Sequence, residues 1–249
     1  MEVCILRNIF LEISYIGSGF FGFQKQPGKR TVESVLQRAI EDTVKHPVKI
    51  FYGGRTDRGV HSQGQAVNFY SDTKIDIGNL PQVINYHLPK DVSVIGSKYV
   101  DEKFHARYSA KKKHYRYLIY NGRYRNSLYE DRAWHFPFKL DEKNMQRFFD
   151  QLPGERDFAS FMGKNAVVKD TIRRLDKIEV RRKNNLIIID FYGKSFLKNM
   201  IRIMVGSVVK LSHEKKDIKE IKEILDKTRR GYAGPTAPAH GLYFLEIEY

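Results

Sequence analysis

Apolar residues in the first hundred positions alternate between strand-like runs and helix-like spacing. The runs are rich in β-branched and aromatic residues and end at glycine or other turn-forming residues, which is typical of strands. Between them, Val32, Leu36 and Ile40 recur at the spacing of one helix face. Thr31 precedes them as an N-cap, although Ser34 stands where a capping box would prefer Glu. The predicted order is strand, helix, strand, strand, helix, strand, at residues 10–15, 31–44, 48–52, 65–70, 80–88 and 92–100.

The second half of the chain predicts another α+β layer with additional helix. The predicted strands are 115–121, 133–136, 174–180, 186–191 and 242–248, and the predicted helices are 142–151, 196–211 and 218–227. The order β-α-β-β-α-β, predicted above for the first hundred residues, characterises a split, ferredoxin-like unit. We therefore expect an α+β fold of two ferredoxin-like halves with mainly antiparallel sheets, divided into residues 1–103 and 104–249. A central cleft between two such domains would suit a large ligand.

Composition narrows the class of protein. A hydrophobic content of 41% excludes a disordered chain, and no apolar run approaches the roughly 18 residues of a transmembrane helix. The single cysteine, Cys4, excludes an internal disulfide framework and a multi-cysteine metal site within one chain. The spacing of His61, His105 and His114 fits no zinc pattern, so no metal is expected. The start of the chain lacks the layout of a signal peptide, which predicts a cytoplasmic protein without a membrane association.

Positive charge is concentrated in one stretch. The chain carries 44 Lys and Arg against 29 Asp and Glu, a net charge of +15. Between His105 and Tyr129 there is no acidic residue, and seven Lys and Arg are interleaved with six tyrosines. Cations can neutralise phosphates while aromatic rings stack on unpaired bases, so this combination favours RNA binding. The alternative is that alternate tyrosines face a core and the cations face water, and residues 115–120 do read as a strand.

The loop from Gly53 to Ser62 lies between two predicted strands and contains one acid, Asp57, between Arg55 and Arg58. Nearby positive charge favours the ionised carboxylate. Such a carboxylate, on a loop fixed by strands, can act as a nucleophile or base while the arginines hold phosphates. The alternative is an ordinary turn, because Asp followed one residue later by Gly is a common turn signature.

The loop also carries a family resemblance. Gly54-Arg55-Thr56-Asp57-Arg58-Gly59-Val60-His61 resembles the signature G-R-T-D-x-G-V-H of the type A tRNA pseudouridine synthases. Two departures from the family pattern are Ile16, where Asp is usual, and Phe23, where Trp is usual; both are expected to support the loop. Six further segments resemble the family in chain order, at residues 15–26, 31–33, 104–117, 154–161, 195–206 and 233–243.

This resemblance implies a role for each matching residue. Asp57 is implied to be the catalytic nucleophile, and Tyr115 to stack on the target base and assist proton transfer at C5. Arg202 is implied to pair with the catalytic aspartate, while Arg55 and Arg58 flank a uridine flipped out of the stacked RNA. The candidates for contact with the RNA backbone are Arg107, Lys111, Lys112, Lys113 and Lys198.

The implied reaction breaks the N1–C1′ bond of a uridine, turns the base and rejoins it through C5, without a cofactor. Attack of Asp57 on C6 of the base and attack on C1′ of the ribose (or elimination to a glycal) both stay open. The implied substrate is the anticodon stem-loop of tRNA at positions thirty-eight to forty, bound by a homodimer. The alternatives are the same chemistry on another RNA and a non-catalytic basic RNA-binding module. The combination of Asp57, Tyr115 and Arg202 disfavours the second alternative, and a metal-dependent nuclease would need an acidic cluster.

Overall fold

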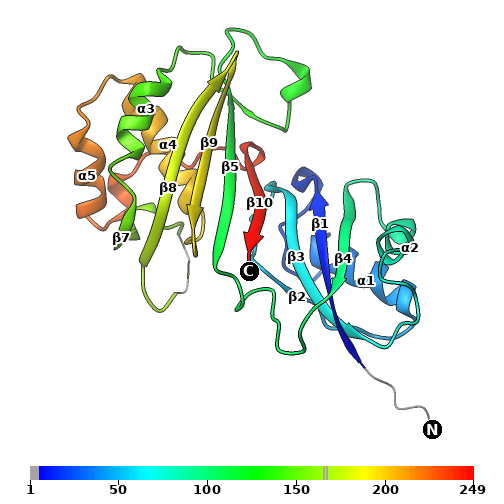
Figure 1. Cartoon of the computed structure of the whole chain (residues 1–249). Coiled ribbons are helices and arrows are strands. Elements are labelled where there is room, and N and C mark those ends of the chain that lie inside the picture. Colours follow the sequence, from blue (N-terminus) through cyan, green and yellow to red (C-terminus); the bar gives the residue numbers. More distant parts are fainter. Residues whose placement is uncertain (1–5, 165, 167) are drawn as a thin grey trace. The chain divides into compact units, whose positions relative to one another are not determined.

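The computed structural model of this chain describes residues 6–164, 166 and 168–249. Cys4 and the start of the chain, on which the expectation of a cytoplasmic protein partly rested, lie outside these residues. Residue contacts divide the chain into two compact units, Met1–Lys111 with Phe244–Tyr249, and Lys112–Tyr243. Each unit combines helices with mostly antiparallel strands (Figure 1), which confirms the mixed α+β class. The division into residues 1–103 and 104–249 stays a prediction.

The described residues of the first unit form five strands, one of them only in part, and two helices. Its elements are β1 (Arg7–Tyr15), α1 (Val32–Val44), β2 (Phe51–Tyr52), β3 (His61–Ser71), α2 (Leu80–His87), β4 (Val92–Tyr99) and the part of β10 (Leu242–Glu248) that begins at Phe244. The strand order is β4-β1-β3-β10, and β2 pairs with β3. The pairs β1–β3, β1–β4 and β2–β3 are all antiparallel.

Both helices of the first unit bury their apolar faces against its strands. Leu36 and Ile40 of α1 and Ile84 of α2 share one fully buried cluster with Leu11 and Ile13 of β1. α1 begins as predicted, because the Thr31 side chain accepts a hydrogen bond from the Ser34 N–H at 3.3 Å and the Ser34 side chain accepts one from the Thr31 N–H at 3.3 Å. The serine thus completes the capping box in place of the preferred Glu.

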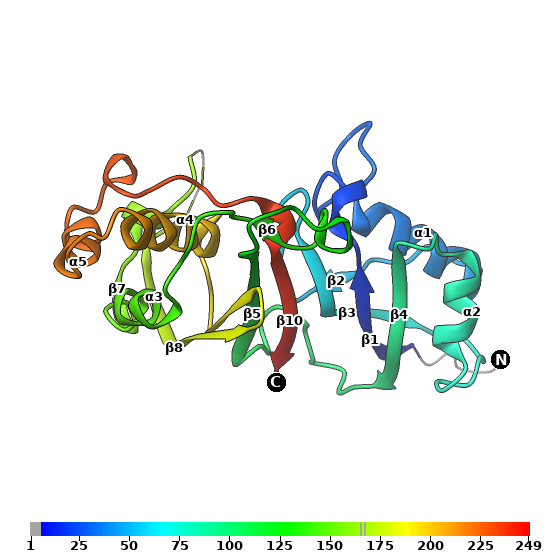
Figure 2. The same ribbon diagram turned by 90° about the horizontal axis from the view of Figure 1, so that it is seen from above.

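The second unit builds a four-stranded antiparallel sheet with a short parallel strand at one side. Its elements are β5 (Lys112–Tyr120), β6 (Trp134–His135), α3 (Glu142–Phe149), β7 (Gly154–Asp157), β8 (Ile172–Lys183), β9 (Leu186–Gly193), α4 (Met200–His213) and α5 (Lys219–Asp226). The order is β5-β9-β8-β7, and β6 runs parallel to β5. Helices α3 and α4 lie on one side of β8 and β9 (Figure 2), where the Phe149 and Phe191 rings meet edge to face at 5.6 Å.

Several elements differ in their bounds from the sequence expectation; β2, for example, spans Phe51–Tyr52 instead of residues 48–52. Three differences have a clear physical reason. β7 was not predicted, because its sequence Gly-Glu-Arg-Asp is polar and it is an edge strand that pairs with β8 alone. β3 begins at His61 rather than residue 65, since buried polar side chains such as Ser62 disguise its start. α4 begins at Met200 rather than residue 196, because Asn199 has a left-handed backbone with φ of 58°, a conformation that Asn tolerates better than most residues. No helix in the described part of the chain is both long enough and apolar enough to cross a membrane.

Candidate active site

The Asp57 loop connects β2 to β3 in the first unit. The Val60 N–H donates to the Asp57 carbonyl at 3.1 Å, and Gly59 between them has a positive φ of 83°, as the third position of a type II turn requires. The ordinary turn expected from the sequence is therefore present. It uses a backbone atom of Asp57, so the turn alone does not account for a carboxylate at this position. The Asp57 side chain is half-buried.

A neighbouring segment, residues 15–23, holds this loop in place. The Phe23 N–H donates to the Thr56 carbonyl at 3.1 Å, and the Gly17 N–H donates to Nδ1 of His61 at 3.1 Å. A Cβ atom at Gly17 would overlap the Val60 carbonyl, so only glycine fits there. The loop is thus fixed from outside by contacts that the sequence pattern did not reveal.

Tyr15 adds a buried polar support below the loop. Its hydroxyl lies 2.8 Å from Oγ1 of Thr56. Burial raises the pKa of Tyr15 to about 12, although hydrogen bonds from Thr56, Gln65 and Ser62 act in the opposite direction. Tyr15 therefore stays neutral at physiological pH. The Phe23 ring is fully buried beside it, 4.5 Å from the Tyr52 ring, as a supporting role requires.

Arg55 and Arg58 are both exposed on the same loop. The Arg58 guanidinium lies 4.3 Å from the centre of the Phe21 ring, a cation–π contact that restrains it at the surface. Within the described part of the chain, Arg55 makes no hydrogen bond or ion pair. Its guanidinium is thus available to an anionic ligand beside Asp57.

Two of the RNA-backbone candidates also lie in the first unit. Arg107 and Lys111 are exposed, and the Arg107 guanidinium lies 5.7 Å from the ring centre of Tyr108. The His105 ring packs 4.9 Å from the Phe51 ring. Burial lowers the pKa of His105, and the charge of Arg107 acts in the same direction. His105 is therefore neutral, and it lies beside Arg107 without adding a further positive charge.

Tyr115 lies on β5 in the second unit, in register with Phe191 of β9. Its side chain is 8% exposed, and its ring meets the Phe196 ring edge to face at 5.1 Å. This packing is that of a core tyrosine near the surface, and the role of Tyr115 at the target base stays a prediction. Lys112 and Lys113 on the same strand are half-buried, whereas Lys198 is exposed with its Nζ 3.4 Å from the Lys164 carbonyl.

Arg202 lies in the first turn of α4 and is held by two acceptors. Its Nε donates to the Ala237 carbonyl and its Nη1 to Oδ1 of Asn199, both at 2.8 Å. The Asn199 side chain therefore serves the arginine instead of capping the helix. Burial raises the pKa of the nearby Tyr117 hydroxyl, and the positive charge of Arg202 opposes this rise. Arg202 thus lies within electrostatic reach of the β5 face that also carries Tyr115.

The segment Gly234–Ala237 fixes the position of Arg202. The Gly234 N–H donates to Oγ of Ser207 at 2.8 Å, and the Ala237 N–H donates to the Arg202 carbonyl at 3.0 Å. Gly206 lies so close that an added Cβ would overlap the Pro235 carbonyl. The glycine- and proline-rich motif near the end of the chain therefore anchors one face of α4.

A buried carboxylate that the sequence analysis missed fixes the strand that carries Tyr115. Asp190 of β9 is fully buried, and its oxygens lie 2.8 Å from His114 Nε2, 2.8 Å from Arg116 Nε and 2.6 Å from Arg181 Nη1. Burial alone would raise the pKa of Asp190, but hydrogen bonds from His114 and Arg116 outweigh it and hold the pKa below its ordinary value. The signal in the sequence that could have identified Asp190 is that it is the one acid within the otherwise apolar run 186–191.

Replacing Asp190 by Asn is expected to lower the free energy of unfolding by about 1–3 kcal/mol at neutral pH, because Arg116 and Arg181 lose their counter-charge and His114 loses a charged acceptor. Since the folded pKa is depressed, this contribution is complete above the unfolded carboxyl pKa and is lost as the pH falls through the folded pKa. Urea unfolding of both proteins, followed by Trp134 fluorescence, should therefore show a difference at pH 7 that shrinks in acid. A difference independent of pH would contradict the ionised state of Asp190.

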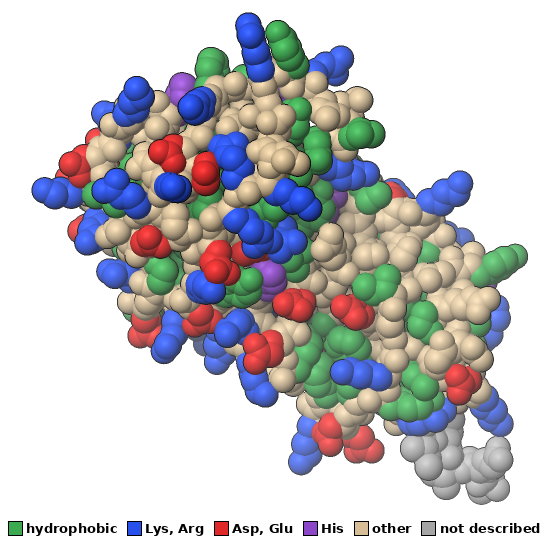
Figure 3. Space-filling view, turned by 45° about the horizontal axis from the view of Figure 1, so that its top comes forward, with side chains coloured by type: hydrophobic (Ala, Val, Ile, Leu, Met, Phe, Trp, Pro, Cys, Tyr) green, Lys and Arg blue, Asp and Glu red, His purple; other side chains and the backbone are tan. Residues whose placement is uncertain are grey.

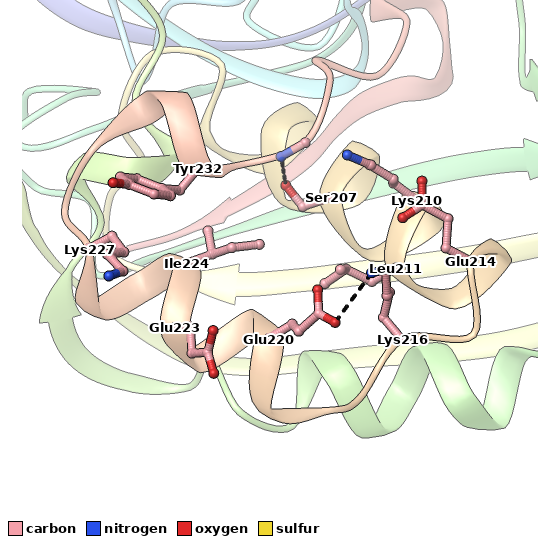
Figure 4. A pocket seen from close by; sticks show the side chains of 11 residues that line it. Ser207, Lys210, Leu211, Glu214, Lys216, Glu220, Glu223, Ile224, Lys227 and Tyr232 are labelled. Carbon is pink, nitrogen blue, oxygen red and sulfur yellow. Dashed lines mark hydrogen bonds and ion pairs between the residues drawn. The ribbon is translucent and has the colours of Figure 1, made fainter.

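One hollow of the second unit is separate from these residues. A pocket of about 310 Å³ lies between α4, α5 and the segment around Tyr232 (Figure 4), and no predicted site residue lines it. Lysines and glutamates alternate along its wall, and Lys216 lies 3.8 Å from Glu220. This mixture of charges gives no selectivity for a polyanion.

Neither the surface charge nor the arrangement of possible metal ligands locates the candidate site by itself. On the face shown in Figure 3, acidic side chains lie among the Lys and Arg side chains instead of leaving one continuous basic block. Within residues 6–164, 166 and 168–249, no three His, Cys, Asp or Glu side chains gather as metal ligands would. The Asp57 loop is therefore the candidate site of the first unit, and Tyr115 and Arg202 are the candidate residues of the second.

Comparison with known proteins gives one consistent result. The chain matches the family model described as tRNA pseudouridine synthase over residues 13–109 and 149–249. It is 37% identical over 244 residues to tRNA pseudouridine synthase A of Acetivibrio thermocellus, covering 98% of this chain and 100% of that protein. For Caldicellulosiruptor bescii the identity is 38%, with the same coverage. For Bacillus pumilus it is 37% over 239 residues, covering 95% of this chain and 97% of that protein. Asp57 and Arg202 lie within the matched ranges, whereas Tyr115 lies between them.

Proposed function

The chain belongs to the tRNA pseudouridine synthase family, and we propose that it isomerises uridines of the tRNA anticodon stem-loop with Asp57 as the nucleophile. As a member of this family the protein is an isomerase that acts on tRNA. The observation that carries the proposed mechanism is the Asp57 loop. It holds a half-buried carboxylate on a turn that is fixed by the Tyr15–Thr56 contact and by Gly17, with two exposed arginines beside it.

In this mechanism Asp57 supplies the electron pair that lets the glycosidic bond break. Attack on C6 of the base or on C1′ of the ribose both lead to a covalent intermediate, and both require the target uridine to leave the base stack. After C5 joins C1′, the proton on C5 is released to solvent. N1 takes up a proton in its place and the bond to Asp57 breaks, so the product is an isomer of uridine and no cofactor takes part.

Tyr115 and Arg202 are proposed to assist the same uridine. A tyrosine at the edge of a core can offer its ring to a base while the surrounding packing keeps its orientation. Arg202 has its Nε and Nη1 held by Ala237 and Asn199, which pre-orients the rest of the planar guanidinium for a carboxylate partner. We propose Asp57 as that partner. Arg55 and Arg58 then flank the flipped nucleotide.

Finer points of architecture are also proposals. In chain order the elements of the first half read β1-α1-β2-β3-α2-β4. With β6, β7 and α5 left out, those of the second half read β5-α3-β8-β9-α4-β10, which supports two ferredoxin-like halves with the RNA in a central cleft. A homodimer would extend the basic surface available to one tRNA. A cytoplasmic location follows from the proposed substrate.

Mapping the product tests this function. The wild-type chain is incubated with an unmodified tRNA transcript, and pseudouridines are located by mass spectrometry after chemical tagging. We expect product at positions thirty-eight to forty. Product elsewhere in the tRNA would contradict the anticodon assignment alone. Bound tRNA without any product would contradict the enzymatic function.

Arg107 is proposed to contact phosphates, together with Lys111, Lys112, Lys113 and Lys198. Replacing Arg107 by Ala is expected to weaken tRNA binding and to lower the slope of log K against log salt concentration by about one. Filter binding at several salt concentrations measures this slope. Arg38→Ala is the matched control, because Arg38 is 86% exposed on α1 and its partner Asp42 is on the same helix. Equal slopes for both variants would show that Arg107 touches no phosphate.

A further inference from the structure

A closed loop follows β5 in the second unit (Figure 1), and we call residues 121–133 the arginine–tyrosine loop. Its two ends are held together by Asn121. The Asn121 Nδ2 donates to the Phe136 carbonyl at 2.7 Å and to the Phe138 carbonyl at 2.8 Å, and the Phe136 N–H donates to the Tyr120 carbonyl at 2.9 Å. Compact loops whose ends meet in this way are frequently functional.

The inner side of the loop is well ordered. The Tyr129 ring stacks on the Tyr120 ring, with centres 5.0 Å apart and planes 21° apart. The Tyr129 carbonyl accepts the N–H groups of Arg132 and Ala133, each at 3.0 Å. A Cβ at Gly122 would come within 2.6 Å of the Tyr120 hydroxyl. The loop is therefore built on a fixed aromatic base rather than on a flexible connection.

The outer side presents unpaired cations and apolar groups to solvent. Tyr124 is 73% exposed and Leu128 is 82% exposed, and the Arg123 guanidinium lies 5.3 Å from the centre of the Tyr124 ring. Arg125 lines a hollow of about 190 Å³ together with Tyr129 and Trp134. Glu130 and Asp131 also line this hollow, yet within the described residues neither Arg123 nor Arg125 has a carboxylate within 4.0 Å.

An exposed ring with a cation over its face, beside a second unpaired arginine, suits an unstacked nucleotide. Aromatic faces stack on bases without regard to sequence, and arginines contact the adjoining phosphates. Tyr and Arg are also common in protein interfaces, but the acid-free run from His105 to Tyr129 continues into this loop and favours a polyanion. We infer that the arginine–tyrosine loop is a second RNA-contact element. Tyr124 receives an unpaired base of the tRNA, and Arg123 and Arg125 hold its phosphates.

The position of the loop places this contact away from the reacting uridine. Tyr115 and Tyr120 lie on one strand, and a strand rises about 3.4 Å per residue, so the loop begins about 17 Å beyond Tyr115. Residues 121–133 also fall between the two ranges that match the family model. The contact therefore deepens the proposed function, on which it rests, by adding a determinant of substrate choice.

The test is tRNA binding by Tyr124 variants in an Asp57→Asn background, which separates binding from turnover. Tyr124→Ala is expected to raise the Kd for an unmodified tRNA transcript about tenfold, the loss of one base–aromatic stack. Tyr124→Phe keeps the ring and should stay within about twofold. Tyr86→Ala is the matched control, since Tyr86 is 86% exposed on α2 and should leave the Kd unchanged.

The arginines are tested by the salt dependence of the same binding. Arg125→Ala is expected to lower the slope of log K against log salt concentration by about one, whereas Arg147→Ala, at an exposed position of α3, should leave it unchanged. Light scattering of each variant follows self-association in parallel.

Unchanged tRNA binding by Tyr124→Ala and Arg125→Ala would overturn the inference, even if wild type makes pseudouridine. Unchanged tRNA binding with altered self-association would also overturn it and would assign the loop to contacts between copies of the chain. A wild-type chain that binds tRNA but makes no pseudouridine would contradict the proposed function instead, and the Kd values would still decide the role of the loop.

Discussion

Asp57→Asn is expected to abolish pseudouridine formation while the fold and tRNA binding persist. Asn is nearly isosteric with Asp, and the turn depends on the backbone carbonyl of residue 57, which accepts the Val60 N–H. A neutral amide cannot act as the nucleophile, so turnover should fall by at least about 10⁴-fold, as for other enzymes that lose a nucleophile. Single-turnover reactions with mass detection of the product measure this loss.

A second carboxylate provides the control for this substitution. Asp42 on α1 is 51% exposed and faces Arg38 one turn away, so Asp42→Asn removes one negative charge without touching the loop. Asp42→Asn should turn over like wild type, and all three proteins should share one Tm and one tRNA Kd. Retained turnover by Asp57→Asn would remove Asp57 from the mechanism.

Gly206→Ala is expected to lower both stability and turnover, because the added Cβ would overlap the Pro235 carbonyl. A backbone atom cannot move aside as a flexible side chain does, so the segment Gly234–Ala237 must shift from α4. Overpacking of this kind costs about 1–3 kcal/mol, which corresponds to a fall in Tm of a few degrees for a chain of this length. The shift also displaces the Ala237 carbonyl, to which Arg202 Nε donates at 2.8 Å.

Gly231→Ala is the matched control for this prediction. Gly231 lies a few residues before the same segment, and an added Cβ there would meet nothing within 4 Å. Its unfolding and turnover should therefore resemble those of wild type. If Gly206→Ala matched Gly231→Ala in both thermal unfolding and turnover, the segment would not position Arg202.

Local patterns were sufficient for much of the fold. α1 was predicted at its observed place because Val32, Leu36 and Ile40 mark one face and Thr31 marks its start. β7 has no apolar residue in Gly-Glu-Arg-Asp, and its strand conformation depends on pairing with β8. The predicted starts of β3 and α4 were wrong for a similar reason. Distant contacts decide where β3 begins, and the left-handed backbone of Asn199 decides where α4 begins.

The site shows the same division between local and distant information. The Asp57 loop could be recognised because its chemistry is contained in eight consecutive residues. The residues that hold this loop in place could not be recognised from the sequence, because Gly17 and Tyr15 contact the loop only after folding. The contact between Gly206 and Pro235 likewise joins residues far apart in the chain. Among the residues that the sequence analysis missed, Asp190 had a local signal, because it is an acid within an apolar strand.

Release of tritium from tRNA labelled at C5 of uridine tests the central claim most directly, because the C5 proton must leave when C5 joins the ribose. Wild type and Asp57→Asn are compared at equal tRNA occupancy. The proposed mechanism predicts rapid release by wild type and none by Asp57→Asn. Release by both would contradict the role of Asp57, and release by neither, with tRNA still bound, would contradict the isomerase itself.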